Sequence, residues 1–276
     1  MQTPGSSANL GPGFDVLGVA VSRSVWVCDD ELDGEPCGPD HIARIAYEKA
    51  GGHGDIWFGF DLEPGRGLGF SAAARAAGAV LAQIQQGHDI AEAQRLAYPV
   101  VAAIEGHGDN AAPAVFGGLH VIAGDHQHRI NAPLPGRLLC WVPELETDTD
   151  NSRLELPSLI PRPDAVFNLG RLGLLIAAIY EGDLDLLRLA TEDRLHQPPR
   201  LAQCSPARRA HAVALEAGAA AAWLSGSGPT IAILCAPERV DEVARALPEE
   251  GRVLRLDVDL EGAVIAERVG SNWSAG

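Results

Sequence analysis

Hydrophobic and polar positions along the chain change between strand-like and helix-like patterns without a regular strand–helix repeat. Residues 16–21 and 24–29 are short, mostly apolar runs typical of strands, and the second is expected to turn Trp26 into the core. Residues 71–86 carry small and apolar side chains on nearly every helical face, which predicts a helix buried on most sides. Because strands and helices mix without strict alternation, the pattern predicts an α+β fold and not a doubly wound sheet.

Further helices and strands are predicted along the rest of the chain. The expected helices cover 42–50, 90–104 with a kink or restart at Pro99, 168–180, 185–190, 208–218 and 238–247, and the expected strands cover 57–60, 119–122, 138–143, 231–235 and 253–258. The pair Pro198 and Pro199 is expected to end any helix before it, and the polar segment around Trp273 is expected to lie outside regular structure. A connection rich in turn-forming residues marks the predicted boundary between a first domain, 1–132, and a second, 133–276.

Alternating glycines precede the most apolar of these helices. Gly65, Gly67 and Gly69 allow positive φ angles and close approach of a ligand to the backbone, and the free N–H groups at the start of a helix carry partial positive charge. The segment is therefore suited to an anion, although an ordinary glycine-rich turn before a core helix gives a similar sequence. A second glycine-rich stretch, 225–230, favours a phosphate-rich ligand held from two sides.

Two polar stretches lie outside the predicted helices and strands. Residues 4–15 are dense in Pro, Gly, Ser and Asn, which predicts a loop whose polar side chains are Asn9 and Asp15. These two residues fit either turn chemistry or a ligand site. Residues 105–118 bring two carboxylates, an imidazole and an amide close together between apolar residues. A metal–phosphate complex would give these groups partners, and an exposed turn is the alternative.

Composition and charge exclude several classes of function. The chain has 276 residues, 46% hydrophobic content and a net charge of −16 at pH 7, which predicts a soluble folded protein. So much negative charge argues against a nucleic-acid or anionic-membrane partner. A phosphate site stays compatible with it, because helix N-termini, arginines and a bound metal make a site locally positive. The single lysine, Lys49, lies outside any Walker-type frame.

The cysteines and histidines give weaker signals. The five cysteines are scattered without a CxxC pair, which predicts reduced thiols, and no signal peptide or membrane span is evident, so a cytoplasmic location is expected. His120, His126 and His128 have a spacing close to that of metal sites. An exposed hairpin tip gives the same residues and is the favoured interpretation.

Five stretches, in order along the chain, resemble motifs of the GHMP kinase superfamily, most closely its homoserine kinase branch. They are SSANLGPGFD at 6–15, GLGFSAA at 67–73 against GLGSSAA, EGHGDN with a trailing FGG at 105–118 against EGHPDN and FGG, DRLHQPPR at 193–200 against DRLHQPYR, and LSGSGPT at 224–230 against LSGAGPT. The resemblance implies a ribosomal-protein-S5-like N-terminal domain packed on a ferredoxin-like C-terminal domain. Phe70 replaces the first serine of the phosphate motif, and His41 stands where the superfamily tends to carry an asparagine near the nucleotide.

The resemblance also implies ATP- and Mg²⁺-dependent phosphorylation of the L-homoserine hydroxyl in threonine synthesis, and it suggests a homodimer. The residues that it assigns to the nucleotide are Gly65, Arg66, Gly67, Leu68, Gly69, Phe70, Ser71, Ala72, Ala73, Ser225 and Gly226. Ser71 and Glu105 would hold Mg²⁺, a cation that prefers oxygen ligands.

The remaining assignments concern the substrate. Asp15 would hold its ammonium group, and Arg153 with Arg200 its carboxylate, for which the planar guanidinium is suited. Asn9 and Asn110 would position the hydroxyl. Asp109 is either the base for that hydroxyl or a structural partner of its own loop. Two other functions are considered: a GHMP kinase for another small hydroxylated metabolite, and a non-catalytic relative that binds a nucleotide or an amino acid.

Overall fold

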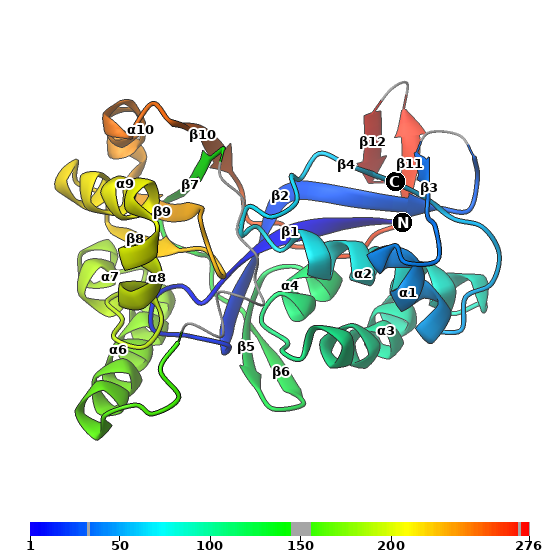
Figure 1. The fold of residues 1–276 in the computed structure, drawn as a ribbon, viewed down its shortest axis with the longest axis horizontal. Coiled ribbons are helices and arrows are strands. Elements are labelled where there is room, and N and C mark those ends of the chain that lie inside the picture. Colours follow the sequence, from blue (N-terminus) through cyan, green and yellow to red (C-terminus); the bar gives the residue numbers. More distant parts are fainter. Residues whose placement is uncertain (32–33, 145–155, 270–271, 276) are drawn as a thin grey trace.

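The protein is described here by a computed structural model covering residues 1–31, 34–144, 156–269 and 272–275. Two sheets, each accompanied by helices, lie next to each other (Figure 1). Every strand pairing in them is antiparallel, so among the described residues no two hydrogen-bonded neighbouring strands run parallel. The expected α+β fold is confirmed. Within the same residues, no helix has the length and apolar character needed to cross a bilayer.

The first sheet is organised around its longest strand, β2. Its strands are β1 (Gln2–Ala8), β2 (Leu17–Cys28), β3 (Glu35–Pro36), β4 (Trp57–Phe60), β5 (Leu119–Ala123) and β6 (His126–Ile130). Residues 4–8 pair with β2, with a register shift between Pro4 and Gly5 that accommodates the proline. The predicted loop over 4–15 was therefore wrong in its first part, because pairing with β2 satisfies the backbone groups of this stretch.

β2 also joins the two strands predicted over 16–21 and 24–29 into one. The expectation that Trp26 faces the core was wrong: Trp26 is half-buried, while Val25 and Val27 are fully buried on the opposite face. A Cβ atom on Gly59, its partner on β4, would lie 2.3 Å from the Trp26 Nε1 atom. The indole therefore lies over a glycine on the outer face of the sheet.

Helices α1 to α4 lie on one side of the first sheet (Figure 1). They are α1 (Ile42–Lys49), α2 (Phe70–Gln85), α3 (Ile90–Glu105) and α4 (Ala111–Phe116). The buried residues of α2 lie on all its faces, as its small and apolar side chains predict. α3 continues through Pro99 without a restart.

The second sheet has the strand order β10-β7-β9-β8. Its strands are β7 (Arg137–Pro143), β8 (Ala221–Leu224), β9 (Ile231–Cys235) and β10 (Gly251–Leu256), and its helices are α6 (Arg162–Glu181), α7 (Leu184–Ala190), α8 (Gln197–Gln203), α9 (Ser205–Glu216) and α10 (Val240–Ala246), the last preceded by a 3₁₀ turn, Pro237–Arg239. Pro198 and Pro199 lie in the first turn of α8, so the expectation that they only end a helix was wrong. A proline is tolerated there because the N–H groups of the first turn have no partner within the helix.

The chain passes between the two sheets from β6 to β7 and again after β10. After the second passage it returns to the first sheet, where Val258 forms a bridge with Val21 and Val264 forms one with Gln2. It then forms a hairpin of β11 (Ala266–Val269) and β12 (Asn272–Ala275). The expectation that Trp273 lies outside regular structure was wrong, because it belongs to β12. The domain limits 1–132 and 133–276 stay a prediction.

Candidate phosphate and substrate site

The two glycine-rich stretches meet through their backbones. Gly65, Gly67 and Gly69 have φ angles of 67°, 76° and 70°, which favour glycine. A Cβ atom on Gly67 would lie 2.6 Å from the carbonyl oxygens of both Ser225 and Gly228. The Ser225 hydroxyl donates to the Gly67 carbonyl at 2.6 Å. The second stretch therefore packs directly on the first.

Strand β1 supplies serines that hold the two glycine-rich stretches in this arrangement. The Ser6 N–H donates to the Leu68 carbonyl at 2.9 Å, and the Ser6 hydroxyl donates to Asn110 Oδ1 at 2.8 Å. A Cβ atom on Gly69, the residue that precedes α2, would lie 2.1 Å from the Ser6 hydroxyl oxygen. The Ser225 hydroxyl also contacts the Ser7 hydroxyl at 2.8 Å.

A cavity of about 130 Å³ lies where these segments converge. Three predicted motifs line it, and its lining residues are Gly65, Gly67, Gly69, Phe70, Ser71, Ala72, Glu105, His107, Asn110, Gly226 and Ser227. The start of α2, whose N–H groups attract anions, borders the same space. The structure thus brings both predicted metal residues and seven of the eleven predicted nucleotide residues together around one cavity, while Arg66, Leu68, Ala73 and Ser225 do not line it.

Ser71 and Glu105 are in direct contact there. The Ser71 hydroxyl donates to Glu105 Oε1 at 3.1 Å, and the Glu105 side chain is only 9% exposed. Arg75 forms an ion pair with Glu105 and donates to the Ser71 hydroxyl at 2.6 Å. Its Nε atom is buried without a hydrogen-bond partner among the described residues. Sequence reasoning missed Arg75, although it lies one helical turn after Ser71 and is charged in an otherwise apolar helix.

Asp109 is the buried centre of the loop between α3 and α4, with 2% of its surface exposed. Its Oδ1 atom accepts from the Asn110 N–H at 2.9 Å and lies 2.5 Å from His107 Nδ1. Asn110 is thereby held at the cavity through both Asp109 and Ser6. This arrangement is compatible with either role considered for Asp109.

Asn9 links the predicted substrate residues to the cavity. Its amide Nδ2 donates to the Gly226 carbonyl at 2.9 Å, and its Oδ1 accepts from the Asp15 N–H at 3.1 Å. Asn9 and Asp15 have φ angles of 74° and 59°, a conformation that Asn and Asp tolerate better than most residues. Arg200 reaches the same Gly226 carbonyl, with Nη1 at 3.3 Å.

Arg200 is buried beside His196 and Phe14, two residues to which sequence reasoning assigned no role. Its guanidinium lies 5.2 Å from the centre of the Phe14 ring, and Nη1 lies 3.2 Å from His196 Nδ1. His196 stacks on Phe14 and bonds through Nε2 to the Gly11 carbonyl at 2.8 Å. Burial lowers the pKa of His196, and the nearby carboxylates of Asp193 and Asp15 oppose that shift. His196 and Phe14 both lie within the quoted motifs, which was the available signal.

Arg153 lies outside the described residues, so its assignment to the substrate carboxylate stays a prediction.

Phe70 belongs to an aromatic cluster beside the cavity. Its ring packs edge-on against Phe58 and Phe60, with ring centres 5.8 Å and 5.5 Å apart. His41 contacts Phe58 at 4.7 Å and begins α1 by accepting from the Ala43 N–H at 3.2 Å. Burial lowers the pKa of His41, which fits this acceptor role. Part of the Phe70 side chain therefore packs against neighbouring aromatic rings.

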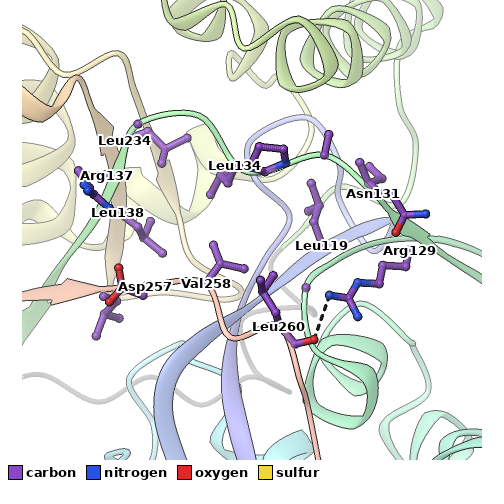
Figure 2. A pocket seen from close by; sticks show the side chains of 16 residues that line it. Leu119, Arg129, Asn131, Leu134, Arg137, Leu138, Leu234, Asp257, Val258 and Leu260 are labelled. Carbon is purple, nitrogen blue, oxygen red and sulfur yellow. Dashed lines mark hydrogen bonds between the residues drawn. The ribbon is translucent and has the colours of Figure 1, made fainter. Parts of the chain in front are cut away.

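A second cavity, of about 540 Å³, lies between the two sheets where the chain passes from one to the other (Figure 2). Its walls include Leu119, Leu134, Leu138 and Val258, and Arg129 at its edge donates to the Leu260 carbonyl at 2.9 Å. None of the predicted site residues that the structure describes lines it. Although this cavity is larger than the one at the glycine stretches, its volume does not identify it as the site of the chemistry.

The three histidines considered as metal ligands are not assembled. Among the described residues, no group of three or more His, Cys, Asp and Glu side chains could hold a metal ion. His120 bonds to the Gly117 carbonyl and Gln127, both at 2.8 Å, and His126 and His128 lie on the exposed strand β6.

Comparison with known proteins places the chain in a family. Residues 35–118 match the GHMP kinases N terminal domain, and residues 175–253 match the GHMP kinases C terminal domain. Homoserine kinase from Thermus thermophilus is 37% identical, with 94% of this chain and 95% of that protein covered. Homoserine kinase from Desulfitobacterium hafniense is 33% identical, with 96% and 99% covered.

Solved structures agree with this assignment. A homoserine kinase from Cytophaga hutchinsonii matches with a TM-score of 0.81 and 25% identity, covering 95% of each chain. A mevalonate kinase from L. major in complex with R-mevalonate matches with a TM-score of 0.66 over 95% of this chain and 96% of that chain, and its 16% identity supports the fold alone. The chain therefore belongs to the GHMP kinases and, within them, to the homoserine kinase family.

Proposed function

We propose that this chain transfers the γ-phosphoryl group of ATP to the hydroxyl of L-homoserine, a step of threonine synthesis. The observation that carries the proposal is that both glycine stretches and residues 105–110 converge on one cavity. The carbonyl of Gly226, a residue of that cavity, contacts Asn9 and Arg200. Relatives named homoserine kinase support the choice of substrate.

The triphosphate is assigned to residues 65–73 together with Ser225 and Gly226. Backbone N–H groups at the start of α2 supply fixed positive dipoles, and the absence of side chains on the glycines permits close approach. Arg75 adds a full positive charge at the cavity, and a phosphate oxygen would give its buried Nε a partner.

The donor set at Ser71 and Glu105 fits Mg²⁺. A hydroxyl and a carboxylate are hard oxygen ligands, and Mg²⁺ needs only one or two such protein groups when phosphates and waters complete its shell. When bound, the cation neutralises charge on the phosphates. Glu105 would hold the cation, and Arg75, which pairs with Glu105 in the structure, would then be available to a phosphate oxygen.

The substrate is assigned to the side of the cavity at Gly226, whose carbonyl Asn9 and Arg200 both contact, with Asp15 held by Asn9. Asp15 is the proposed partner of the ammonium group, and Arg200, with Arg153, the proposed partner of the carboxylate. The proximity of Asp15 and Arg200 to the same histidine, His196, supports this placement.

The chemistry consists mainly of alignment and charge stabilisation. The homoserine hydroxyl oxygen attacks the γ-phosphorus while the bond from that phosphorus to the bridging oxygen breaks, and ADP leaves. The hydroxyl proton passes either to Asp109 or to a phosphate or water oxygen. Replacing Asp109 by Asn separates these routes: a fall in kcat of about a hundredfold or more identifies a base, and a fall below about tenfold identifies a structural role.

An ADP-release assay with Mg-ATP tests the function. The acceptors are L-homoserine, L-serine, L-threonine, mevalonate and shikimate, with a control lacking any acceptor. We expect turnover with L-homoserine above all others. Turnover with another acceptor would favour a different GHMP kinase, and no turnover with ATP still bound by calorimetry would favour a non-catalytic relative.

Two further parts of the proposal are a cytoplasmic location and a homodimer. All five cysteines, Cys28, Cys37, Cys140, Cys204 and Cys235, are free thiols in the structure, which fits a reducing compartment.

A further inference from the structure

The outer face of α6 is apolar and exposed. Val166, Leu169 and Tyr180 are 61%, 69% and 58% exposed. Their spacing places them on one stripe along the helix. This stripe, from Val166 to Tyr180, is about 20 Å long at 1.5 Å per residue. Leu159 and Ile160, also exposed, extend the apolar surface just before the helix starts. α6 lies at the edge of the molecule, away from the first sheet (Figure 1).

The opposite face of α6 is polar in its first half, where Asn168 and Arg171 bond to Asp193 and Glu192, and apolar in its second half. Leu175, Ala178 and Ile179 are buried against the rest of the second half of the chain. A helix at the surface of a monomer normally carries charged or polar residues on its outer face, whereas the outer face of α6 carries Val166, Leu169 and Tyr180. The sequence of α6 is therefore that of a helix with a second partner.

Two glycines lie within the exposed stripe. Gly170 and Gly173 are exposed, and a Cβ atom on either would meet nothing within 4 Å. A glycine inside a helix costs about 1 kcal/mol relative to alanine, and packing within the described residues does not require either one. Glycines on a helix face let another backbone approach closely, and contact with a second helix would therefore explain their presence despite this cost.

The stripe is complementary to itself in the antiparallel direction. With Gly173 at a twofold axis, Val166 of one copy lies opposite Tyr180 of the other. Arg162 and Glu181, both exposed at opposite ends of the helix, then come together, with Cα atoms offset by about one turn along the axis. Neither has an ion-pair partner among the described residues. Apolar residues at the centre and opposite charges at the ends are the features of a two-fold interface.

We propose that α6 is the contact surface of a homodimer, in which the helices of two copies pack antiparallel across Gly173. The proposal identifies a surface for the homodimer named above, and it does not depend on the phosphoryl transfer. Its tests measure mass and cross-linking, so that its failure leaves the proposed activity unaffected.

Sedimentation equilibrium of the full chain across a wide range of concentration is the first test. We expect a monomer–dimer equilibrium for the unchanged chain and a monomer for Leu169→Glu, because the carboxylate would be buried against the partner. Ile265→Glu is the matched control: Ile265 is an exposed aliphatic residue outside α6 and should leave the dimer intact. A monomer for the unchanged chain, or a dimer of Leu169→Glu as tight as the unchanged one, would overturn the proposal.

Charge exchange and cross-linking test the antiparallel arrangement. Arg162→Glu should weaken the dimer by placing like charges together, and the double variant Arg162→Glu with Glu181→Arg should restore it. Gly173→Cys should form a disulfide between copies under mild oxidation, because position 173 meets its own counterpart at the axis. Failure of the double variant to restore association, or cross-linking no faster than that of the unchanged chain, would exclude this geometry.

Discussion

Arg75 holds the carboxylate that the proposed function assigns to Mg²⁺. Its ion pair with Glu105 lies at the cavity, and the two side chains are 21% and 9% exposed. Removing one member of a largely buried pair leaves the other charge uncompensated, which destabilises the folded state. The charge of Glu105 is thus balanced by a residue of the same helix that begins after the first glycine stretch.

Arg75→Met is therefore expected to lower the free energy of unfolding in metal-free buffer by about 1–3 kcal/mol. Added Mg²⁺ should recover part of this loss, because the freed carboxylate of Glu105 becomes a ligand. Urea denaturation with and without Mg²⁺ measures both effects. Arg95→Met is the control, since the Arg95–Glu92 pair is exposed and should have little effect. Equal losses for the two variants would contradict this role for Arg75.

Arg200 is the second residue whose role can be tested alone. Arg200→Ala should raise the KM for L-homoserine about 30-fold or more, since truncating a buried charged partner costs roughly 2–5 kcal/mol, while the KM for ATP changes little. Arg200→Lys should raise the KM for L-homoserine less than Arg200→Ala does, because lysine keeps the charge but not the planar fork. Initial-rate measurements with each substrate varied in turn give the comparison. An unchanged homoserine KM would remove Arg200 from the site.

At the scale of single elements, α2 shows how a local sequence signal positions a candidate binding surface. Its start is fixed by Gly69, whose positive φ angle ends the glycine run, and its apolar sides allow it to lie between α1, α3 and the first sheet. Both properties are local in sequence, and both were predicted. The direct packing of Gly67, which precedes the helix, on the second glycine stretch depends on the whole fold and was not predicted.

Gly69→Val should abolish ATP binding. The added side chain would displace the Ser6 hydroxyl, and the φ angle of 70° disfavours a β-branched residue. Gly87→Val is the matched control, because Gly87 follows the other end of α2 with a φ angle of 90° and nothing within 4 Å of an added Cβ. Calorimetric titration should show ATP binding lost only for Gly69→Val. Binding retained by a folded Gly69→Val protein would move the phosphate site elsewhere.

Strand β1 shows the opposite case. Its sequence, with Pro4, Gly5 and two serines, has the composition of a loop, and pairing with β2 makes it a strand. The same pairing turns Ser6 and Ser7 toward the glycine stretches, where their hydroxyls have partners. Local propensity pointed to a loop here because the stabilising contacts come from residues far along the chain.

At the scale of the whole molecule, three largely buried histidines make stability depend on pH. Burial lowers the pKa values of His120, His196 and His211 below 6.5. The unfolded chain therefore binds more protons than the folded protein once the pH falls below about 6.5, and the free energy of unfolding decreases until the folded pKa values are passed. Above pH 6.5 these groups are neutral in both states and contribute no pH dependence.

Urea denaturation between pH 7.5 and 5 tests this linkage. Stability should decrease steadily below about pH 6.5, and His120→Gln should reduce the slope, because one proton-binding difference is removed. His126→Gln is the control, since His126 is exposed on β6. Stability that is constant or that increases on acidification over this range would contradict the prediction.

The sequence by itself determined the features that depend on nearby residues: the α+β class, the helices at the glycine run and at 42–49, and the identity of the five motifs. Backbone sterics and side-chain periodicity act over a few residues, so they can be recognised in the chain. Only the tertiary structure decided which groups share a site. Asn9 meets Gly226 across 217 positions, and Arg75 meets Glu105 across 30, because each contact requires the packed arrangement of several elements. The strand character of β1, the outward position of Trp26 and the uncovered face of α6 were decided at that level too, since burial is a property of the whole fold.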